Sequence, residues 1–586
     1  MANMVNITID GLKVQVPEGS TVLDAAKLAN IDIPTLCYLK EVNAIGACRM
    51  CLVEVEGLRT LQAACVCPVR EGNVIHTRSQ RVRNARKINL ELILSNHERN
   101  CLQCPRNNNC ELRNLAGKYG IDDIRFDSET PNFEIECSNP SLVRNNNKCI
   151  LCRRCVAVCK KVQKVEAIDV TMRGMKSHVT NAFERPIEDT ECILCGQCIN
   201  VCPTGALTEK SSIDNVWDAI NDPTKHVVVQ IAPAVRAAIG EEFGLPMGTN
   251  ANGKMVTATR RLGVDAVFDT NTSADLTIME EGTELLNRVQ NGGKLPMITS
   301  CSPGWINYCE HFFPEFIPNL SSCKSPHMMF GAVLKSYYAK KAGVDPKDMV
   351  VVSVMPCVAK KYEATRPEFE VDGVRDVDYV ITTRELAAMI KEAGIDFNAL
   401  EDSDYDNPFT VASGAGAIFG VTGGVMEAAL RTVAEKIAGR PLEDVDITSA
   451  RGKEGTKEIT INAGDVTLKA LVVSGVGNAK EVLQKIKDNG GESEYQFIEV
   501  MGCPGGCIMG GGQPIYDSVT REHTDVFALR SSVIYNIDKD SAIRKSHENE
   551  NIQKLYEEFL EEPNSKVAHK YLHTTYTPKG RFGKTN

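Results

Sequence analysis

The pattern of apolar and polar positions predicts a small mixed domain at the amino terminus. Apolar and polar side chains alternate over residues 5–16, on both sides of an Asp-Gly pair that is typical of a two-residue hairpin turn. Ser20 or Thr21 then caps a short amphipathic helix over residues 22–29. A hairpin followed by a helix predicts a β-grasp domain.

Farther along the chain, helical and strand-like periodicities succeed each other. A helix is predicted over residues 81–96, where apolar side chains recur at Val82, Ala85, Ile88, Leu92 and Ile93. From about residue 211, helical patterns alternate with β-branched runs at residues 227–231, 350–354 and 379–382. Such runs predict buried, largely parallel strands. We therefore expect two α/β lobes that enclose a site at their interface.

Length and charge narrow the classes of protein. With 586 residues the chain is too long for one core, so several domains are expected. A net charge of -10 argues against nucleic acid and anionic membranes as partners. The first residues form neither the basic nor the apolar segment of a secretory leader, and no run reaches the length of a membrane span. We expect a cytoplasmic protein.

Cysteine is the most informative residue type. The chain has 23 cysteines, most of them grouped in short repeats. In a small secreted protein such groups predict disulfides, but in a long chain without a leader they indicate metal. Zinc is the competing metal, because Cys-x2-Cys pairs are equally typical of zinc sites.

An internal repeat decides against zinc. Two triplets with a trailing fourth cysteine have the spacing of bacterial two-cluster ferredoxins, in which the fourth cysteine ligates the other cluster. The predicted ligands of cluster one are Cys149, Cys152, Cys155 and Cys202, and those of cluster two are Cys192, Cys195, Cys198 and Cys159. Zinc ribbons do not need triplets with a crossover cysteine.

Three later segments carry cysteines beside glycine and proline. They are Thr299-Ser-Cys301-Ser-Pro-Gly-Trp305, Met355-Pro-Cys357-Val-Ala-Lys-Lys-Tyr-Glu363, and the glycine-rich stretch from Phe497 to Pro514 with Cys503 and Cys507. In this order they resemble the three signature loops of the iron-only (FeFe) hydrogenases. The resemblance runs from about residue 5 to beyond the Arg544–Asn549 stretch.

The amino-terminal cysteines fit the same resemblance. One group of four is similar to the 2Fe-2S ligands of hydrogenases and of respiratory complex I: Cys37, Cys48, Cys51 and Cys65. His97, Cys101, Cys104 and Cys110 are similar to a 4Fe-4S site held by one histidine and three cysteines, although a lone histidine is more often an ordinary core or surface residue. Cys67, Cys137, Cys309 and Cys323 have no assigned role and are expected to be buried thiols.

The resemblance implies a multidomain protein of α+β and α/β parts. The expected domains are a 2Fe-2S β-grasp domain at 1–79, a histidine- and cysteine-ligated 4Fe-4S domain at 80–138, a two-cluster ferredoxin-like domain at 139–210 and a two-lobed α/β catalytic domain at 211–586. The last would hold the H-cluster, a 4Fe-4S cluster joined through one cysteine to a di-iron centre with carbonyl, cyanide and a bridging dithiolate.

By resemblance, Cys357, Cys503 and Cys507 are ligands of the H-cluster. Cys357 or Cys503 is the expected bridge to the di-iron unit, with Cys503 preferred. The residues expected to contact the di-iron unit through backbone or apolar side chains are Ala232, Pro233, Met355 and Pro356. Lys360 matches a lysine that holds a cyanide ligand by a charged hydrogen bond. Its ordinary interpretation is an exposed lysine.

Two positions depart from the family pattern. Most members have two adjacent cysteines in the first loop, a proton shuttle followed by a ligand, where this chain has Cys301-Ser302. Either Cys301 is the shuttle and Ser302 stands at the ligand position, or Cys301 ligates and Ser302 relays the proton. His327 stands where the family more often has glutamine, which indicates altered surroundings of the site.

A proton path is also implied by position. Glu281, Glu284, Ser321 and Arg288 match a buried relay that ends at Cys301. Carboxylates three residues apart share a helix face, and burial raises their pKa toward values useful for passing protons. Without the family context, a solvated cluster of charges on a helix is the simpler interpretation.

The resemblance therefore predicts reversible reduction of protons to hydrogen. One 2Fe-2S and three accessory 4Fe-4S clusters would carry electrons to or from ferredoxin or flavin-containing, NAD(P)-linked subunits. One alternative is an electron-transfer subunit like that of complex I, which leaves the three signature loops unexplained. The other is a hydrogenase-like sensory or assembly protein.

Overall fold

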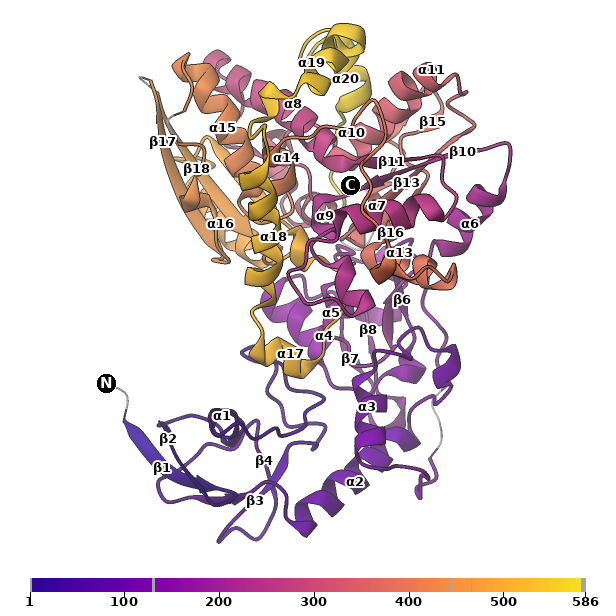
Figure 1. The fold of residues 1–586 in the computed structure, drawn as a ribbon. Coiled ribbons are helices and arrows are strands. Elements are labelled where there is room, and N and C mark those ends of the chain that lie inside the picture. The colour runs from indigo at the N-terminus through magenta and orange to yellow at the C-terminus, as the bar shows by residue number, and fades with distance from the viewer. Residues whose placement is uncertain (1–2, 129–131, 443, 465, 581–586) are drawn as a thin grey trace.

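The computed structural model describes residues 3–128, 132–442, 444–464 and 466–580. Figure 1 shows an elongated molecule in which the amino-terminal unit forms an arm, a large body lies at the opposite end, and the cysteine-rich segments lie between them. Among the described residues, no helix combines the length and the apolar character that a membrane crossing requires.

The amino-terminal arm is a five-stranded sheet packed against one helix. Its elements are β1 (Met4–Ile9), β2 (Leu12–Pro17), α1 (Val22–Leu28), β3 (Leu52–Val55), β4 (Gln62–Ala63) and β5 (Val74–His76), in the sheet order β2-β1-β5-β3-β4. β1 and β2 form the predicted hairpin. Thr21 caps α1 through reciprocal hydrogen bonds with Asp24. The β-grasp prediction is confirmed.

The next helix, α2 (Gln80–Ser95), lies where it was expected, but its buried face differs from the predicted one. Ile88 and Leu92 are 40% and 43% exposed. Arg86 is buried instead, and its guanidinium donates two hydrogen bonds to the Leu52 carbonyl at 2.6 and 3.1 Å. Because the guanidinium is hydrogen-bonded to the backbone of β3, it can occupy a core position that hydrophobicity alone assigns to an apolar residue.

The central segment contains two short strand pairs and two short helices. They are β6 (Leu142–Arg144) with β9 (Leu207–Glu209), β7 (Asp169–Thr171) with β8 (His178–Thr180), α4 (Arg154–Ala157) and α5 (Gln197–Val201). The preceding helix, α3 (Glu111–Lys118), docks on this segment, since the Glu111 N–H donates to the Pro203 carbonyl at 3.0 Å.

Two four-stranded sheets form the body. The first is wholly parallel in the order β11-β10-β13-β16 and contains all three predicted strands, so the prediction of buried parallel strands is confirmed. The second has the order β12-β19-β18-β17, with β17 antiparallel to β18. The strands of the body are β10 (His226–Ile231), β11 (Ala266–Asp269), β12 (Met297–Ile298), β13 (Met349–Met355), β14 (Glu370–Val371), β15 (Val374–Arg375), β16 (Tyr379–Thr382), β17 (Thr456–Ala463), β18 (Val466–Ser474) and β19 (Phe497–Met501).

The 22-residue helix α8 (Thr270–Asn291) joins the two lobes of the body. Leu276 packs in the core around the first sheet, while Ala274 and Ile278 pack in the core around the second. The other helices are α6 (Ile213–Asn221), α7 (Asn252–Arg261), α9 (Pro303–Phe312), α10 (Pro326–Val333), α11 (Ala339–Ala342), α12 (Ala359–Glu363), α13 (Thr383–Glu392), α14 (Gly414–Ile418), α15 (Gly424–Ala438), α16 (Val476–Asp488), α18 (Val526–Asp540), α19 (Glu550–Leu555) and α20 (Lys566–Leu572).

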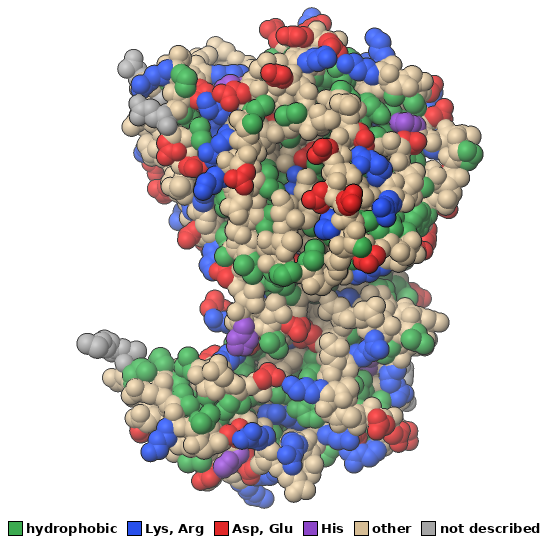
Figure 2. Space-filling model, viewed as in Figure 1, with side chains coloured by type: hydrophobic (Ala, Val, Ile, Leu, Met, Phe, Trp, Pro, Cys, Tyr) green, Lys and Arg blue, Asp and Glu red, His purple; other side chains and the backbone are tan. Residues whose placement is uncertain are grey.

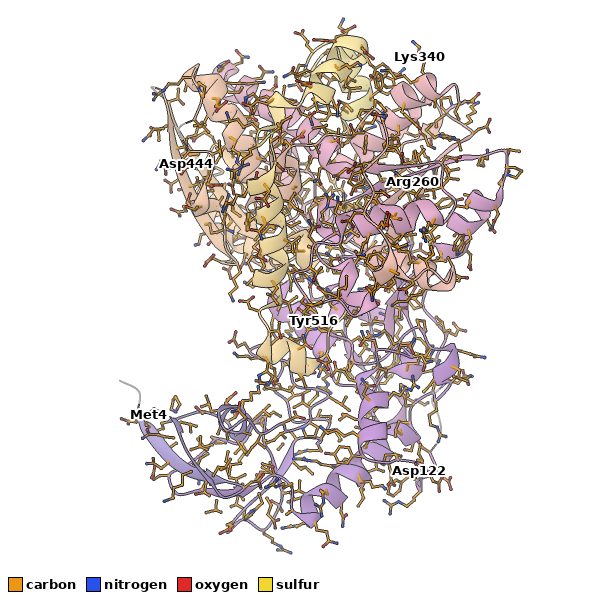
Figure 3. All side chains as sticks on the ribbon, viewed as in Figure 1. Met4, Asp122, Arg260, Lys340, Asp444 and Tyr516 are labelled. Atoms are coloured by element: carbon orange, nitrogen blue, oxygen red, sulfur yellow. The ribbon has the colours of Figure 1, made fainter. Side chains whose placement is uncertain are left out.

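The carboxyl-terminal part of the chain returns to the arm through α17 (Ser518–His523). Tyr516, labelled in Figure 3, marks the place where this segment leaves the body. The Ser518 hydroxyl donates to Glu111 at 2.7 Å, and Glu522 forms an ion pair with Lys27 of α1 at 3.1 Å. The molecule narrows near this junction, as the space-filling view in Figure 2 shows.

A buried ion pair ties the segment before α10 to the strand region of the first lobe. The Lys324 ammonium donates to Asp376 at 2.7 Å, and both side chains are 1% exposed. We expect Lys324→Met to lower the free energy of unfolding by about 3–5 kcal/mol, because it leaves a buried carboxylate unpaired. Denaturant unfolding followed by circular dichroism measures this loss. The double variant with Asp376→Leu should recover most of it, and equal losses in the two variants would contradict the explanation.

Candidate active site

The three cysteine loops meet in one cavity between the two lobes. The space between the protein atoms here, including the solvent at the opening of the cavity, is about 740 Å³. It is lined by Cys301, Ser302, Cys357, Cys503 and Cys507, together with Ala232, Pro233, His327, Met355, Pro356 and Lys360. Segments more than two hundred residues apart in sequence thus bring all the H-cluster candidates named above to one place. The walls are otherwise mainly apolar, with proline, alanine, methionine and phenylalanine side chains.

The first loop is anchored to the second sheet. The Trp305 indole N–H donates to the Thr299 carbonyl at 3.0 Å, and the Thr299 hydroxyl accepts from the Val500 N–H at 3.1 Å. Trp305 is fully buried. These bonds hold residues 301 and 302 at the end of β12, beside the end of β19 where the third loop begins.

Cys301 and Ser302 have different surroundings. The Ser302 hydroxyl accepts a hydrogen bond from the Gly502 N–H at 3.1 Å, so it lies against the third loop next to Cys503. Burial raises the pKa of the Cys301 thiol well above its ordinary value, and the charge of Glu281 is the largest contribution after burial. Cys301 is therefore associated with the glutamates of α8, and Ser302 with the other cysteine loops.

The two cysteines of the third loop also have different surroundings. Burial raises the pKa of both thiols, followed by the charge of Cys357. The charge of Cys195 of the central segment then raises the pKa of Cys503 further, whereas the Lys360 ammonium lowers the pKa of Cys507. Cys503 thus lies toward the ferredoxin-like segment and Cys507 toward Lys360.

Lys360 belongs to a buried polar group at the cavity wall. Its ammonium donates to Glu363 at 2.9 Å, to the Ser325 hydroxyl at 3.1 Å and to the Cys301 carbonyl at 3.3 Å. His327 forms a 2.6 Å hydrogen bond with the same Glu363 carboxylate. Burial and then Lys360 lower the pKa of His327 to about 4, so its imidazole is neutral at neutral pH. Glu363, which the sequence analysis did not single out, therefore fixes both side chains.

The predicted proton-relay residues lie together beneath the cavity. Arg288 donates to Glu284 at 2.6 Å, and the Ser321 hydroxyl donates to the other oxygen of Glu284 at 2.9 Å. Glu281 is 1% exposed, and within the described residues neither of its carboxylate oxygens has a hydrogen-bond partner. Burial and then the charge of Glu284 raise the pKa of Glu281 to about 8. This carboxyl group is accordingly protonated at neutral pH.

The central segment encloses two further cysteine-lined cavities. One is lined by Cys149, Cys152, Cys155 and Cys202, and the other by Cys159, Cys192, Cys195 and Cys198. Each cavity therefore gathers the four thiols that the ferredoxin spacing groups together, including the crossover cysteine. Burial raises the pKa of most of these thiols, as expected for sulfur atoms that metal would convert to thiolates.

The amino-terminal candidates are also grouped. The sulfur atoms of Cys51 and Cys65 are 3.4 Å apart, and Cys37 is hydrogen-bonded to Cys48. Cys67 instead contacts the Pro68 carbonyl and is only half-buried, and Cys137 is exposed, so the expectation of buried thiols is wrong for these two. Cys309 and Cys323 are buried as expected.

The His97 imidazole has the burial and the neutral charge that a metal ligand needs. It is 8% exposed, and its Nδ1 atom is buried without a hydrogen-bond partner among the described residues. Burial, followed by the charges of Lys148 and Arg99, lowers its pKa to about 4, which keeps the ring neutral. A buried acceptor nitrogen without a partner fits a metal ligand better than an ordinary core histidine.

Two amides connect these cysteine sites, and the sequence analysis missed both. The Asn43 amide donates to the carbonyls of Cys37 and Cys152 at 2.8 and 3.0 Å. The Gln163 amide donates to the Gly502 carbonyl at 3.0 Å and to the Cys195 sulfur at 3.5 Å. No spacing signal marks either residue, although each lies within six residues of a cysteine motif.

Glycine brings the third loop against the ferredoxin-like segment. A Cβ atom at Gly511 would lie 2.3 Å from the Cys195 carbonyl oxygen, a distance that no side chain tolerates. The glycine-rich run after Cys507 thus permits backbone contact between two metal-binding regions.

The fold and these cysteine sites define an iron-sulfur oxidoreductase with a buried catalytic metal centre, and comparison with known proteins gives the family. Residues 225–511 match the profile described as iron only hydrogenase large subunit, C-terminal domain, and residues 524–579 match the iron hydrogenase small subunit. Residues 2–80 match a 2Fe-2S iron-sulfur cluster binding domain, residues 86–125 the iron-sulfur binding region of NADH-ubiquinone oxidoreductase G, and residues 139–208 the ferredoxin-like domain of NADH-quinone oxidoreductase subunit 3.

Individual relatives agree over nearly the whole length. The NADP-reducing hydrogenase subunit HndD of Solidesulfovibrio fructosivorans is 49% identical over 99% of this chain and all of its own. Iron hydrogenase 1 of Clostridium pasteurianum is 44% identical over 98% of this chain and all of its own. The structure of an apo FeFe-hydrogenase from Chlamydomonas reinhardtii matches 63% of this chain and all of its own with a TM-score of 0.56 and 43% identity.

The chain belongs to the iron-only (FeFe) hydrogenase family. It binds iron-sulfur cofactors and is an oxidoreductase of this family. The predicted fold class, with its cluster-binding amino-terminal regions and hydrogenase body, is confirmed.

The raised pKa of Glu281 gives a spectroscopic prediction. A carboxyl group with a pKa of about 8 carries its proton at neutral pH and loses it as the pH rises through that value. Infrared difference spectra should therefore contain a protonated carboxyl band that disappears near pH 8 and is absent in Glu281→Gln. Glu499, with a pKa raised to about 7, should titrate at lower pH and serves as an internal control. A band that persists in Glu281→Gln would assign it to another residue.

Proposed function

We propose that this chain catalyses the reversible reduction of two protons by two electrons to hydrogen, with the electrons supplied or removed through its own iron-sulfur clusters. The observation that carries the proposal is the common cavity of the three cysteine loops, with Lys360 in its wall and a buried glutamate relay beneath it. The complex I-like alternative needs neither feature. An assembly or sensory protein needs no proton relay.

The donor set of the cavity fits the H-cluster. Three half-buried thiols, the Ser302 hydroxyl, the Lys360 ammonium and apolar walls line one space. We assign Cys357, Cys503 and Cys507 as ligands, with Ser302 at the fourth position of the 4Fe-4S part. When bound, this cofactor supplies the redox-active iron at which protons and hydrogen interconvert. Because Cys507 is the third-loop thiol beside Lys360, we favour it as the bridge over the expected Cys503.

The chain's own residues would deliver the proton. Arg288 and Ser321 hold Glu284 near the surface end, and Glu281 lies buried next along α8. Glu281 carries a proton at neutral pH and faces Cys301, whose thiol would pass it into the cavity. A thiol suits this step better than a serine hydroxyl because, with an ordinary pKa of about 8.5, it remains the stronger acid of the two even though burial raises the pKa of Cys301. Lys360, Glu363 and His327 form a fixed polar wall that orients groups bound in the cavity.

The electron route follows the contacts between cysteine sites. We assign one 2Fe-2S cluster to the arm, one 4Fe-4S cluster to His97 and its three cysteines, and two to the central segment. Asn43 links the arm to the Cys152 site, and Gly205 packs against Cys104 of the His97 site beside Cys202. Both outer sites therefore adjoin cluster one, while cluster two adjoins the third loop through Gln163 and Gly511. Two entry points would converge on one path to the catalytic centre.

The electron partner is proposed from the amino-terminal relationship. Residues 86–125 and 139–208 match parts of NADH-quinone oxidoreductases, and one relative over nearly the full length is named an NADP-reducing hydrogenase subunit. We propose docking with flavin-containing, NAD(P)-linked subunits, with free ferredoxin as the second candidate. We place this activity in the cytoplasm, where reducing conditions keep cysteines available to iron.

Replacing Glu281 by Gln or Cys301 by Ala should lower hydrogen evolution by at least about a hundredfold, the scale of losing a positioned acid-base group. Gas chromatography of hydrogen measures the rate. The infrared bands of metal-bound carbonyl and cyanide should stay in place, because neither residue is assigned as a ligand. Normal turnover in either variant would contradict the relay, and loss of the bands would show a structural role instead. If these bands were absent from the mature wild-type protein, the proposed function itself would be wrong.

Purification under anaerobic, low-salt conditions from the native host should retain flavin-containing subunits with the chain. The complex should then reduce NAD(P) with hydrogen, measured by absorbance of the reduced nicotinamide. Deleting the arm, residues 1–79, should abolish that reduction and leave hydrogen evolution with a small artificial reductant. An active protein that purifies alone and exchanges electrons only with ferredoxin would exclude the proposed subunits.

A further inference from the structure

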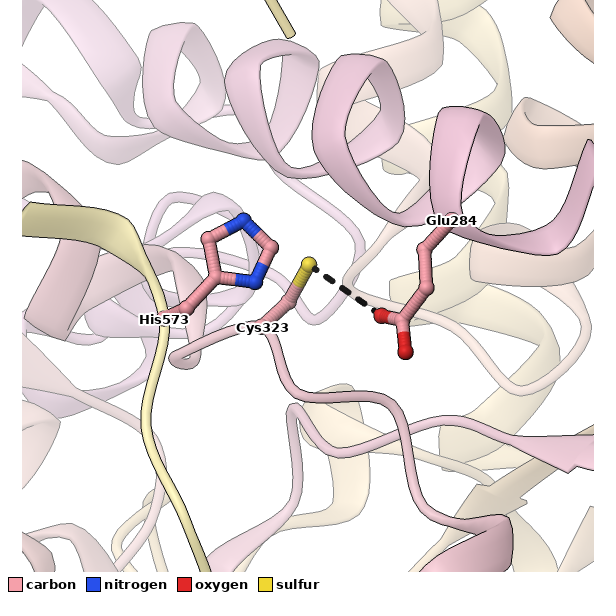
Figure 4. Close-up of side chains that lie close together, drawn as sticks. All are labelled: Glu284, Cys323 and His573. Atoms are coloured by element: carbon pink, nitrogen blue, oxygen red, sulfur yellow. Dashed lines mark hydrogen bonds between the residues drawn. The ribbon is translucent and has the colours of Figure 1, made fainter. Parts of the chain in front are cut away.

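A mixed group of metal-binding side chains lies beside the proposed proton relay, outside every iron site assigned above. One ligand atom each from Glu284, Cys323 and His573 lies within 4.8 Å of the others. Figure 4 shows the sulfur of Cys323 between the imidazole and the carboxylate. The three residues come from α8, the segment before α10 and the segment after α20. Their combination of sulfur, nitrogen and oxygen is one that zinc prefers.

The backbone holds this group in place. Cys323 and His573 are paired in an antiparallel bridge, and the flanking Lys324 N–H and Thr574 N–H donate to the Leu572 and Ser322 carbonyls at 2.8 Å each. Glu284 is fixed on the long helix. Zinc bonds of about 2.0–2.3 Å require ligand atoms roughly 3.2–3.8 Å apart, so small side-chain rotations close the site. The Cys323 sulfur is already 3.9 Å from the Glu284 carboxylate.

His573 has the supporting contact that metal-binding histidines show. Its Nε2 atom is hydrogen-bonded to Glu280 at 3.0 Å, and Nδ1 to the Ser322 hydroxyl at 2.9 Å. Glu280 is fully buried and also accepts from the Tyr556 hydroxyl at 2.5 Å. A carboxylate behind the imidazole orients the ring and increases its basicity toward a metal. Nδ1 can then exchange the serine hydroxyl for a cation.

The surroundings of these three side chains favour the binding of a cation. The Cys323 thiol is fully buried near the carboxyl groups of Glu284, Glu280 and Glu281, of which Glu281 is protonated at neutral pH. A divalent cation would displace the thiol proton to solvent and bind one thiolate, one carboxylate and one neutral imidazole. The two ligand charges balance the cation, and no electron is transferred. The exposed His569 ring contacts the His573 ring, with centroids 4.0 Å apart and the ring planes tilted by 34°.

We propose that Glu284, Cys323 and His573 form a binding site for a divalent cation of the zinc class, and that its occupation stops proton delivery. Ligation withdraws the Glu284 carboxylate from Arg288 and Ser321, the two groups that connect it to the relay. The inhibitory effect rests on the proposed function, whereas binding of the cation does not. Binding and turnover are therefore measured separately.

The test uses the cluster-loaded protein and zinc chloride. Anomalous scattering at the zinc edge should locate one ion among the three side chains, and calorimetry should give its affinity. Cys323→Ala and His573→Gln should weaken zinc binding and inhibition of hydrogen evolution by about 10–100-fold, and Glu280→Gln by a similar factor through the loss of its support to the ring. The second group, with half-buried Glu435 and His547 and exposed Glu548, provides the control, because His547→Gln should change neither zinc binding at the first site nor inhibition.

Four outcomes would decide the proposal. Equal zinc affinity in wild type, Cys323→Ala and His573→Gln, with no anomalous signal at the site, overturns it. If zinc binds at the site and turnover is undiminished, the metal site is confirmed and Glu284 is not part of the proton path. Unchanged electron paramagnetic resonance of the clusters on zinc addition supports the site, and loss of cluster signals would attribute inhibition to damage of the iron centres.

Discussion

Close contact of backbone with backbone at the junction of the body and the ferredoxin-like segment is the constraint on which the rest of the structure depends. Electrons cross that junction only if the last accessory cluster lies near the catalytic centre. Gly511 leaves room for the Cys195 carbonyl, and Gln163 binds both sides of the same contact. A side chain at Gly511 would separate the two metal-binding regions. The glycine-rich run is thus required both by the short distance between the two metal-binding regions and by the geometry of its turns.

Buried charge is the second constraint on the site. Lys360 and His327 share one carboxylate, Glu363, so the cationic group at the cavity wall is paired on its far side. Although burial acts against ionisation, Lys360 and His327 lower the pKa of Glu363 to about 2. Glu281 has no such partner and stays protonated at neutral pH. Two glutamates near one cavity therefore differ in ionisation because only one of them faces a cation.

Much of the architecture could be predicted from sequence, because cysteine spacing and β-branched runs are local signals. The crossover of Cys159 and Cys202 and the parallel strands of the first lobe both follow from such patterns. The buried face of α2 could not, since Arg86 takes a core position only through its bonds to the Leu52 carbonyl. Asn43, Gln163 and Glu363 were missed for the same reason. Asn43 and Gln163 matter because they bind partners more than thirty residues away in sequence. Glu363 matters because it binds His327, which lies on another helix.

The return of the carboxyl-terminal segment to the arm has a consequence for biosynthesis. Ser518 binds Glu111 and Arg154, and Glu522 binds Lys27, so residues made last complete an interface begun by residues made first. During translation the cluster-binding regions emerge and fold before this segment exists. The junction between the ferredoxin-like segment and the body can form only after Gly502 and Gly511 have been made, because both residues take part in it.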